Sequence, residues 1–308
     1  MINKVFGTGG IGTGIFFKLN GGHTMTRDES RLGFLTDYRD YCKCHIILHY
    51  IAVLTENVGV YALGMVGGDE YGAMLMSEMK AAGIDTRYVK VTDKARTMFS
   101  VCYQYGDGSG GNITASNSAC GLVSPGFIDK CTDEIDGNSL VLSAPEVSLE
   151  SRIRLLEIGK ERGAFTVSSF LTEEAADFER EGGFRLSDLI ALNRDEAAAV
   201  ADGDIDAAAE KMLRSNPVLR LIITAGADGC YIYENGLRFH VPPVSAEVVS
   251  TAGAGDAFLG GTVAGLIAGK SFKSAAEYGA VVARFAVMSE NTISKDVTIE
   301  NVRGFMDA

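Results

Sequence analysis

Residues 189–224 read LIALNRDEAAAVADGDIDAAAEKMLRSNPVLRLIIT, and this stretch decides the fold. Two short apolar runs, at 189–192 and 221–223, are separated by alanine-rich segments with the composition of helices. Continuous apolar strands joined by helices are typical of a parallel sheet that is covered on both faces. The stretch therefore predicts a βαβ unit of an α/β protein.

The same alternation extends towards the N-terminus. Apolar runs at 139–143 and 164–167 are each followed by a helical pattern, at 149–162 and 173–181. This repetition predicts a doubly wound α/β sandwich with a mostly parallel sheet. Ligands of such sheets bind at the carboxyl ends of the strands, where Asn193, Thr224 and the turn at 250–256 all fall.

The N-terminal third has a different pattern. Residues 15–19 and 98–105 have strand composition with no helix attached, and glycine-rich turns border them at 21–22 and 106–111. We interpret these strands as a small β lid, contributed by about 13–40 and 96–114, on a single domain that spans 1–308. The segments at 44–56 and 71–82 have helical spacing and are assigned to the main body.

Composition limits the class of protein. The chain has 308 residues, 46% of them hydrophobic, and a formal net charge of −12, which suits a large core and argues against nucleic acid as a partner. No apolar run is long enough for a membrane span, and no signal peptide is indicated. The six scattered cysteines favour reduced thiols, so we expect a cytoplasmic protein with no membrane partner.

The turn Ser250-Thr251-Ala252-Gly253-Ala254-Gly255-Asp256 carries the clearest chemical signal. Its glycines let backbone N–H groups converge at the start of a helix, and such a place attracts phosphate. A carboxylate repels phosphate unless it serves the reaction, and in phosphoryl transfer an aspartate accepts the proton of the attacking hydroxyl. The plainer alternative is a tight strand-to-helix turn that ends in an ordinary N-terminal acid.

Asn193 and Glu196 form a second candidate pair. A carboxamide and a carboxylate three residues apart at the start of a helix point to one side and can hold a hydrated divalent cation. Taken alone, the same pair also fits a helix N-cap followed by a surface acid.

Together these motifs resemble those of the ribokinase/PfkB family of sugar kinases, over nearly the whole chain. Residues 251–258 are similar to the family's C-terminal signature, and Asn193-Arg194-Asp195-Glu196 matches its Asn-x-x-Glu motif. Val66-Gly67-Gly68-Asp69 resembles another family stretch, and 223–229 resembles the strand and turn that line the nucleotide site. The resemblance implies a ribokinase-like three-layer α/β/α sandwich, and a kinase that uses ATP and Mg²⁺ to phosphorylate a hydroxyl of a sugar or sugar-like small molecule.

The resemblance also implies roles for individual residues. Asp256 falls on the catalytic base, and Gly253, Ala254 and Gly255 fall on the anion hole. Glu196 is expected to organise Mg²⁺ through water. The residues expected to contact the nucleotide are Asn193, Glu196, Thr224, Gly226, Gly229 and Thr251. Lids of this family often pair between subunits, so a homodimer through the lid is implied.

The acceptor side departs from the family pattern. The aspartate that commonly follows the first strand is absent from Gly7-Thr8-Gly9-Gly10-Ile11-Gly12, and the usual Gly-Gly-x-x-x-Asn segment is replaced around 40–45. His45 is interpreted as standing where an asparagine normally binds acceptor hydroxyls. Asn112 is a candidate lid contact.

Basic residues also gather near the expected acceptor side. Arg27, Arg31, Arg39 and Lys43 would suit an acceptor that already carries phosphate or carboxylate. Because acids such as Asp28 are interleaved with them, a solvated loop is the favoured interpretation of the cluster.

Three alternatives remain open at this point. Residues 7–12 satisfy Gly-x-Gly-x-x-Gly, the fingerprint of a dinucleotide-binding oxidoreductase, although that fingerprint requires a helix at its third glycine. Cys42, Cys44, His45 and His49 supply the ligand types of a zinc site, but their spacing is short. A kinase-fold regulatory protein that binds nucleotide or sugar without catalysis is the third.

Overall fold

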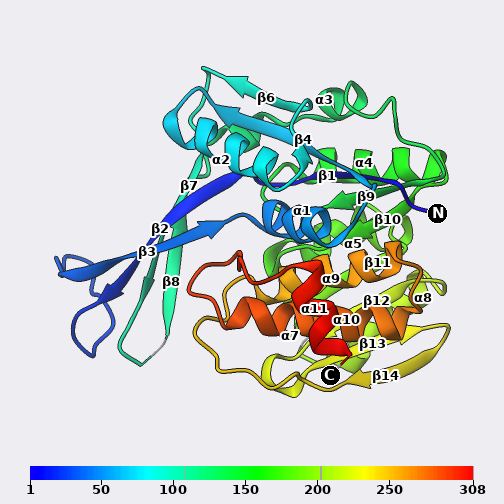
Figure 1. Cartoon of the computed structure of the whole chain (residues 1–308). Coiled ribbons are helices and arrows are strands. Elements are labelled where there is room, and N and C mark those ends of the chain that lie inside the picture. The colour runs from blue at the N-terminus through cyan, green and yellow to red at the C-terminus, as the bar shows by residue number, and fades with distance from the viewer. Residues whose placement is uncertain (108, 202, 308) are drawn as a thin grey trace.

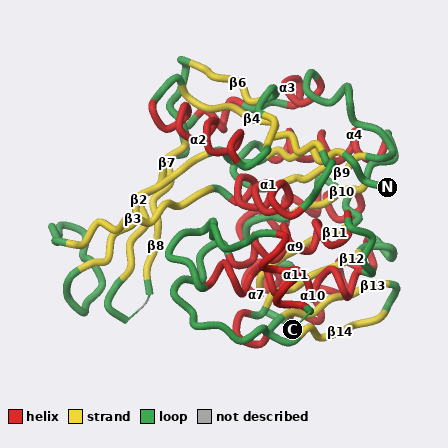
Figure 2. Tube along the Cα trace, viewed as in Figure 1, coloured by secondary structure: helices red, strands yellow, loops and turns green. Residues whose placement is uncertain are grey.

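The computed structural model describes residues 1–107, 109–201 and 203–307, so Gly108, within the turn predicted at 106–111, lies outside the described residues. The described chain forms a large sheet covered by helices, and a separate small sheet that extends to one side of this body (Figures 1 and 2). The α/β/α sandwich expected from the sequence is confirmed.

The large sheet has ten strands among the described residues, in the order β14-β13-β12-β11-β10-β9-β1-β4-β5 with β6 paired to β4. All of its pairs are parallel except β12–β13 and β13–β14. The bounds are β1 (Lys4–Thr8), β4 (Gly59–Gly67), β5 (Ile84–Asp85), β6 (Val89–Thr92), β9 (Ser139–Ser143), β10 (Phe165–Ser168), β11 (Leu189–Asn193), β12 (Arg220–Thr224), β13 (Cys230–Glu234) and β14 (Leu237–Val241).

Helices cover both faces of this sheet because neighbouring strand residues point in opposite directions. Val5 and Leu140 pack with residues of α1 (Lys43–Leu54), α2 (Glu70–Ala81), α9 (Ala254–Ile267) and α10 (Phe272–Val287). Phe6 and Val141 pack on the other face. The helices there are α3 (Pro125–Asp129), α4 (Leu149–Glu161), α5 (Ala175–Arg180), α6 (Gly183–Leu186), α7 (Arg194–Ala198) and α8 (Ile205–Ser215).

Short elements complete the fold. They are α11 (Ile299–Met306), which packs on α10 near the C-terminus, and three 3₁₀ turns at Ala119–Leu122, Thr172–Glu174 and Gly226–Asp228. No helix in residues 1–107, 109–201 or 203–307 is long and apolar enough to cross a membrane. The six cysteines are unpaired and buried.

Helix α9 packs unusually closely against its neighbours. A Cβ added at Gly260 would lie 2.8 Å from the Cβ of Tyr50 in α1, and one at Gly261 would lie 2.7 Å from a methyl group of Val282 in α10. Side chains at these two positions would clash, so glycine is what allows α1 and α10 to approach α9. This packing fixes the helix that begins at the glycine-rich turn.

The small sheet has the order β3-β2-β7-β8. Its strands are β2 (Gly12–Leu19), β3 (Gly33–Tyr41), β7 (Met98–Gln104) and β8 (Gly110–Thr114). Chain segments from the predicted lid regions therefore pair with one another, and β2 follows β1 almost directly. Because a strand and not a helix begins at Gly12, the Gly-x-Gly-x-x-Gly pattern lacks the context that a dinucleotide site needs.

Candidate active site

A cavity of about 1000 Å³ opens at the carboxyl ends of β11 and β12 and at the start of α9. It brings together most residues that the sequence singles out. The predicted residues that line it are Lys43, Asn193, Glu196, Thr224, Gly226, Gly229, Thr251, Gly253, Ala254, Gly255 and Asp256.

The glycine-rich turn is built as an N-terminal cap. Gly253 has a φ of 73°, a left-handed conformation that glycine adopts without strain, and it is followed directly by the first turn of α9. The amide of Ala254 donates to the carbonyl of Thr251, whereas the amides of Gly253 and Gly255 have no partner in the described part of the chain. The turn thus presents free N–H groups at the positive end of a helix.

Asp256 lies in the first turn of α9 and lines the cavity. Burial raises the pKa of its carboxyl, and the nearby ammonium of Lys43 opposes this shift. The Nζ of Lys43 lies 3.8 Å from Oδ1 of Asp256 and 3.1 Å from Oε1 of Glu196. One cation from the start of α1 therefore joins carboxylates from α9 and α7.

Asn193 and Glu196 form a reciprocal cap at the start of α7. The side chain of Asn193 accepts from the amide of Glu196 at 2.8 Å, and Oε2 of Glu196 accepts from the amide of Asn193 at 2.8 Å. The capping interpretation is therefore confirmed, and the cap fixes the Glu196 carboxylate at the cavity wall. The role of Glu196 towards a divalent cation remains a prediction. Its other oxygen, Oε1, faces Lys43.

A neighbouring wall comes from the turn after β12, whose last residue, Thr224, is the strand partner of Asn193. The Oγ1 of Thr224 donates to the carbonyl of Leu192 at 3.3 Å, and a Cβ on Gly255 would lie 4.0 Å from that Oγ1. Gly226 and Gly229 have φ values of 57° and 83°, so the backbone turns sharply along the cavity. The end of β12 and the start of α9 thus form adjacent walls of one site.

Sequence reasoning missed Glu146, which follows the carboxyl end of β9. It adopts a φ of 76°, uncommon for a residue other than glycine, and its Oε2 is buried with no partner among the described residues. Burial raises its pKa to about 7, and the charges of Asp256 and Lys43 act on it in opposite directions. The available signal was only an acid just beyond a buried strand, a position shared with many structural residues.

The space beside Glu146 is narrow and rich in sulfur. A Cβ on Gly12 would lie 2.9 Å from Sγ of Cys42 and 2.8 Å from Cβ of Met98, so a longer side chain has no room there. Asp40 of β3 accepts from Oγ of Ser100 at 3.1 Å, and burial raises its pKa. Asp40 and Glu146 therefore bring carboxylates to a side of the site where the first strand supplies none.

Three of the predicted acceptor contacts, His45, Asn112 and Arg39, do not line the cavity. His45 is 1% exposed, packs edge-on against Tyr41, and has no hydrogen-bond partner for either ring nitrogen in the described part of the chain. Burial lowers its pKa to about 3. Asn112 lies exposed on β8. The roles of His45 and Asn112 as substrate contacts remain predictions, because neither residue makes a contact in the described part of the structure that supports them.

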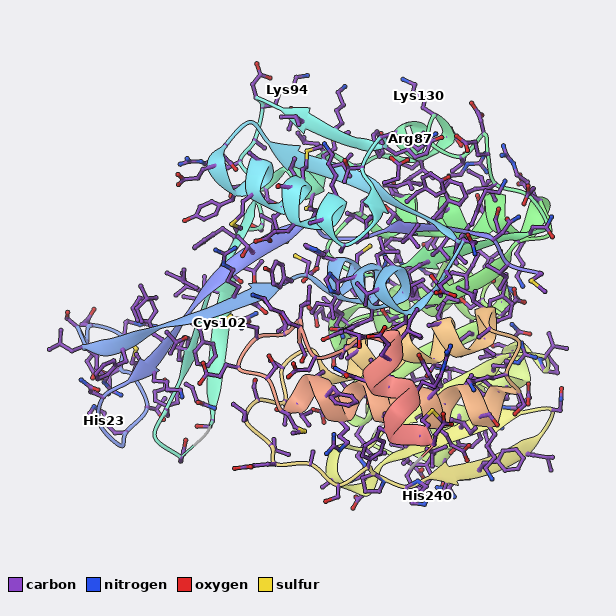
Figure 3. All side chains as sticks on the ribbon, in the orientation of Figure 1. His23, Arg87, Lys94, Cys102, Lys130 and His240 are labelled. Carbon is purple, nitrogen blue, oxygen red and sulfur yellow. The ribbon has the colours of Figure 1, made fainter. Side chains whose placement is uncertain are left out.

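Two of the three arginines of the predicted basic cluster are paired with acids. Arg39 pairs with Glu78 of α2, and Arg31 pairs with Glu29 and donates to the carbonyl of His23. Figure 3 shows His23 at the tip of the small sheet, away from the main body. The cluster thus spreads along the small sheet, and Lys43 is its member at the cavity.

Two of the candidate zinc ligands, Cys42 and His45, also contact other side chains. Cys42 lies 3.6 Å from the sulfur of Met98, and the ring of His45 is turned against Tyr41. Among residues 1–107, 109–201 and 203–307, no three His, Cys, Asp or Glu side chains are placed to hold a metal ion together.

Comparisons with known proteins show which family the sequence matches. The family model of the pfkB family carbohydrate kinases matches residues 47–299. A deoxyribokinase of Salmonella typhi is 24% identical over 262 residues, which cover 83% of this chain and 84% of the relative.

Solved structures share the fold. A ribokinase of Giardia lamblia superposes with a TM-score of 0.87 at 18% identity, over 98% of this chain and 99% of that one. The aminoimidazole riboside kinase of Salmonella enterica, solved with aminoimidazole riboside and an ATP analogue, gives a TM-score of 0.77 at 16% identity over 99% and 100% of the two chains.

Proposed function

The chain belongs to the pfkB family of carbohydrate kinases, and from this premise we propose that it transfers the γ-phosphoryl group of ATP to a hydroxyl of a sugar or sugar-like small molecule. One observation carries the proposal. The turn at Gly253–Asp256 joins a buried carboxylate to free backbone amides at the wall of a large cavity. This is the pairing of a base with an anion hole that phosphoryl transfer to an alcohol needs.

Asp256 is the proposed base. Its carboxylate takes the proton of the attacking hydroxyl as the new P–O bond forms, and ADP leaves with the electrons of the broken bond. Burial raises the pKa of Asp256, which makes its carboxylate a better proton acceptor than an exposed one. The nearby ammonium of Lys43 opposes that rise and favours the ionised form of the base.

The amides of Gly253 and Gly255 are the proposed anion hole for the moving phosphoryl group. They need no reorganisation, because the left-handed Gly253 already presents them. The ammonium of Lys43 contacts both Glu196 and Asp256. From this position it is close enough to attract the negative charge of an incoming phosphate.

Glu196 is the proposed partner of Mg²⁺ through water. The fit rests on a carboxylate, the type of oxygen ligand that Mg²⁺ prefers, which lines the cavity and is held in place by the cap with Asn193; its Oε1 now accepts from Lys43. When bound, Mg²⁺ would neutralise negative charge on the nucleotide phosphates. The residues proposed to contact the nucleotide along the neighbouring wall are Thr224, Gly226, Gly229 and Thr251.

The acceptor is proposed to bind through its hydrogen-bond donors. Glu146 and Asp40 offer carboxylate oxygens, and Lys43 already serves the phosphate side. Because Arg31 and Arg39 are paired with acids, the structure gives no support to an acceptor that carries an anionic group. Hydroxyl groups of a sugar are suitable donors to Glu146.

The small sheet is proposed to act as the lid and to pair with a second copy of the chain. Its strands expose three large apolar side chains, Phe34, Leu35 and Ile113. By strand pairing, Leu35 and Ile113 share one face, which a partner sheet would cover, whereas Phe34 points to the other. Closure over the acceptor would exclude water, which otherwise competes for the phosphoryl group. Six unpaired cysteines favour a reducing, cytoplasmic setting.

The test is an ADP-release screen with Mg-ATP and a panel of sugars, sugar alcohols, nucleosides and sugar acids. We expect one acceptor class to respond, and Asp256→Asn to lower kcat by about 10²–10⁴-fold while ADP binding measured by calorimetry is retained. Silence across the panel with ADP binding intact would instead favour the regulatory alternative, a kinase fold that binds without catalysis.

A further inference from the structure

The end of the cavity away from Asp256 is almost entirely apolar. Its walls are the segment at 242–248 and one face of α10, where Ala280, Ala283 and Val287 line the space. The segment that follows 242–248 is held against the end of α10, because the amides of Val249 and Ser250 both donate to the carbonyl of Val287. Such a slot suits the flat base of a nucleotide whose phosphates lie at the start of α9.

Arg284 interrupts this apolar face. Its Nε donates to the carbonyl of Ser245 at 2.8 Å, and its guanidinium carbon lies 4.5 Å from the ring centre of Phe305. These contacts fix the side chain at the wall of the cavity, which it lines. In the described part of the chain no carboxylate pairs with it, and its two terminal nitrogens donate to no group. These two terminal nitrogens, the fork of the guanidinium, are therefore free to bind a ligand.

The other arginine of the cavity differs in this respect. Arg194 also lines the space, but its Nη2 lies 2.7 Å from Oδ2 of Asp228. Its charge is already matched by a carboxylate. Arg284 has no such partner in the described part of the chain, although it stands among alanine and valine side chains.

The chemistry of that fork selects among bases. A guanidinium has only donors, and its terminal pair matches two neighbouring acceptors. Guanine and hypoxanthine present such a pair at O6 and N7, whereas adenine presents one acceptor and the N6 donor. Pro242 and Pro243, which line the same end, have no N–H of their own to offer.

We propose that Arg284 reads the base of the phosphoryl donor, and that the site accepts 6-oxopurine nucleotides in preference to adenine nucleotides. This inference rests on the proposed function, because it names the donor class for the same kinase site. It extends the range of donors beyond ATP and leaves the roles of Asp256 and Glu196 unchanged.

The experiment is isothermal titration calorimetry of the full chain with ADP, GDP and IDP in the presence of Mg²⁺. These ligands need no knowledge of the acceptor, and IDP separates recognition of O6 and N7 from recognition of the guanine amino group. We expect GDP and IDP to bind about tenfold more tightly than ADP, in line with one bidentate base contact.

Substitutions at Arg284 sharpen the test. In Arg284→Ala the three affinities should converge to within about twofold. In Arg284→Gln the order should reverse in favour of ADP, because a carboxamide offers one donor and one acceptor to adenine. Arg194→Ala is the matched control and should keep the order of the unsubstituted protein. Thermal unfolding of each variant checks that the contact with Phe305 is not needed for folding.

The outcomes separate the two proposals. Equal binding of all three nucleotides, tighter binding of ADP, or a preference that survives in Arg284→Ala would overturn the recognition of the base while leaving the kinase intact. An equal loss for every base in Arg284→Ala would mean stacking without selection and would overturn it too. Failure of every nucleotide to bind at millimolar concentration would overturn both.

Discussion

The two sides of this active site are built differently. On the donor side, the cavity that ends at Asp256, the amides of Gly253 and Gly255 are free in the described part of the chain, and the buried Glu196 is held by a cap. On the acceptor side, around Cys42 and Glu146, the space is narrow and the polar groups are buried.

In the proposed mechanism, this difference separates phosphoryl transfer from recognition of the acceptor. The donor side offers backbone amides and short caps, which suit phosphate. The acceptor side offers side chains from several elements. We therefore expect transfer chemistry and choice of acceptor to depend on separate residues.

Apart from loss of the proposed base itself, the largest effect is expected where the two sides meet, at Lys43. Lys43→Met removes the cation that lowers the pKa of Asp256, so the pH at which activity reaches half its maximum should rise. With a phosphate partner also lost, we expect kcat to fall about a hundredfold. The check is a pH–rate profile with the acceptor that the screen identifies. Lys43→Arg, which keeps the charge, should recover part of the rate; equal loss in both variants would contradict an electrostatic role.

A smaller effect is expected from Glu146→Gln. If Glu146 accepts hydrogen bonds from the acceptor, KM for the acceptor should rise about tenfold, with little change in the KM for the nucleotide. Since burial raises the pKa of Glu146 to about 7, acceptor binding in the unsubstituted protein should improve as the pH rises through 7. The glutamine variant should lose that dependence. If the KM for the nucleotide rose instead, Glu146 would belong to the donor side, and the division between donor and acceptor sides would be contradicted.

The smallest effect on activity is expected from His45→Leu. In the unfolded chain the imidazole of His45 has its ordinary pKa of 6.5, whereas burial in the folded protein lowers that pKa to about 3. The unfolded chain therefore binds the proton more readily, and stability should fall as the pH drops from 6.5 towards 3. The loss should amount to a few kcal/mol, because each pH unit between the two values contributes about 1.4 kcal/mol.

His45→Leu should weaken that acid dependence and leave kcat at neutral pH nearly unchanged. Urea unfolding at pH 4.5 and 7 measures it, with substitution of the exposed His23 as the control. A large rise in the acceptor KM would show that His45 binds substrate after all, as the sequence suggested.

Sequence reasoning found the cavity residues that are neighbours in the chain. The turn at 253–256 and the Asn193–Glu196 pair each form a short local motif, and both line the same cavity; their chemical roles remain predictions. Glu146 was missed because it reaches the site through a left-handed backbone after β9, which no local pattern indicates.

Arg284 was missed for a different reason. It interrupts a run of small apolar residues in 279–287, a visible signal, but its meaning depends on Ser245 and Phe305, which are distant in sequence. The βαβ order and the separate small sheet were predictable because strand and helix periods are local. Contacts between segments far apart in sequence were not.

The glycines of α9 have a consequence for redesign of this enzyme. Because Gly260 and Gly261 touch Tyr50 and Val282 with no space for a methyl group, the helix that carries Asp256 should be left fixed in any mutant library. Residues near Gly12, Asp40 and Cys42, which lie on other elements, are the positions to randomise. A selection for new acceptors could then change specificity while the transfer machinery stays on an unaltered support.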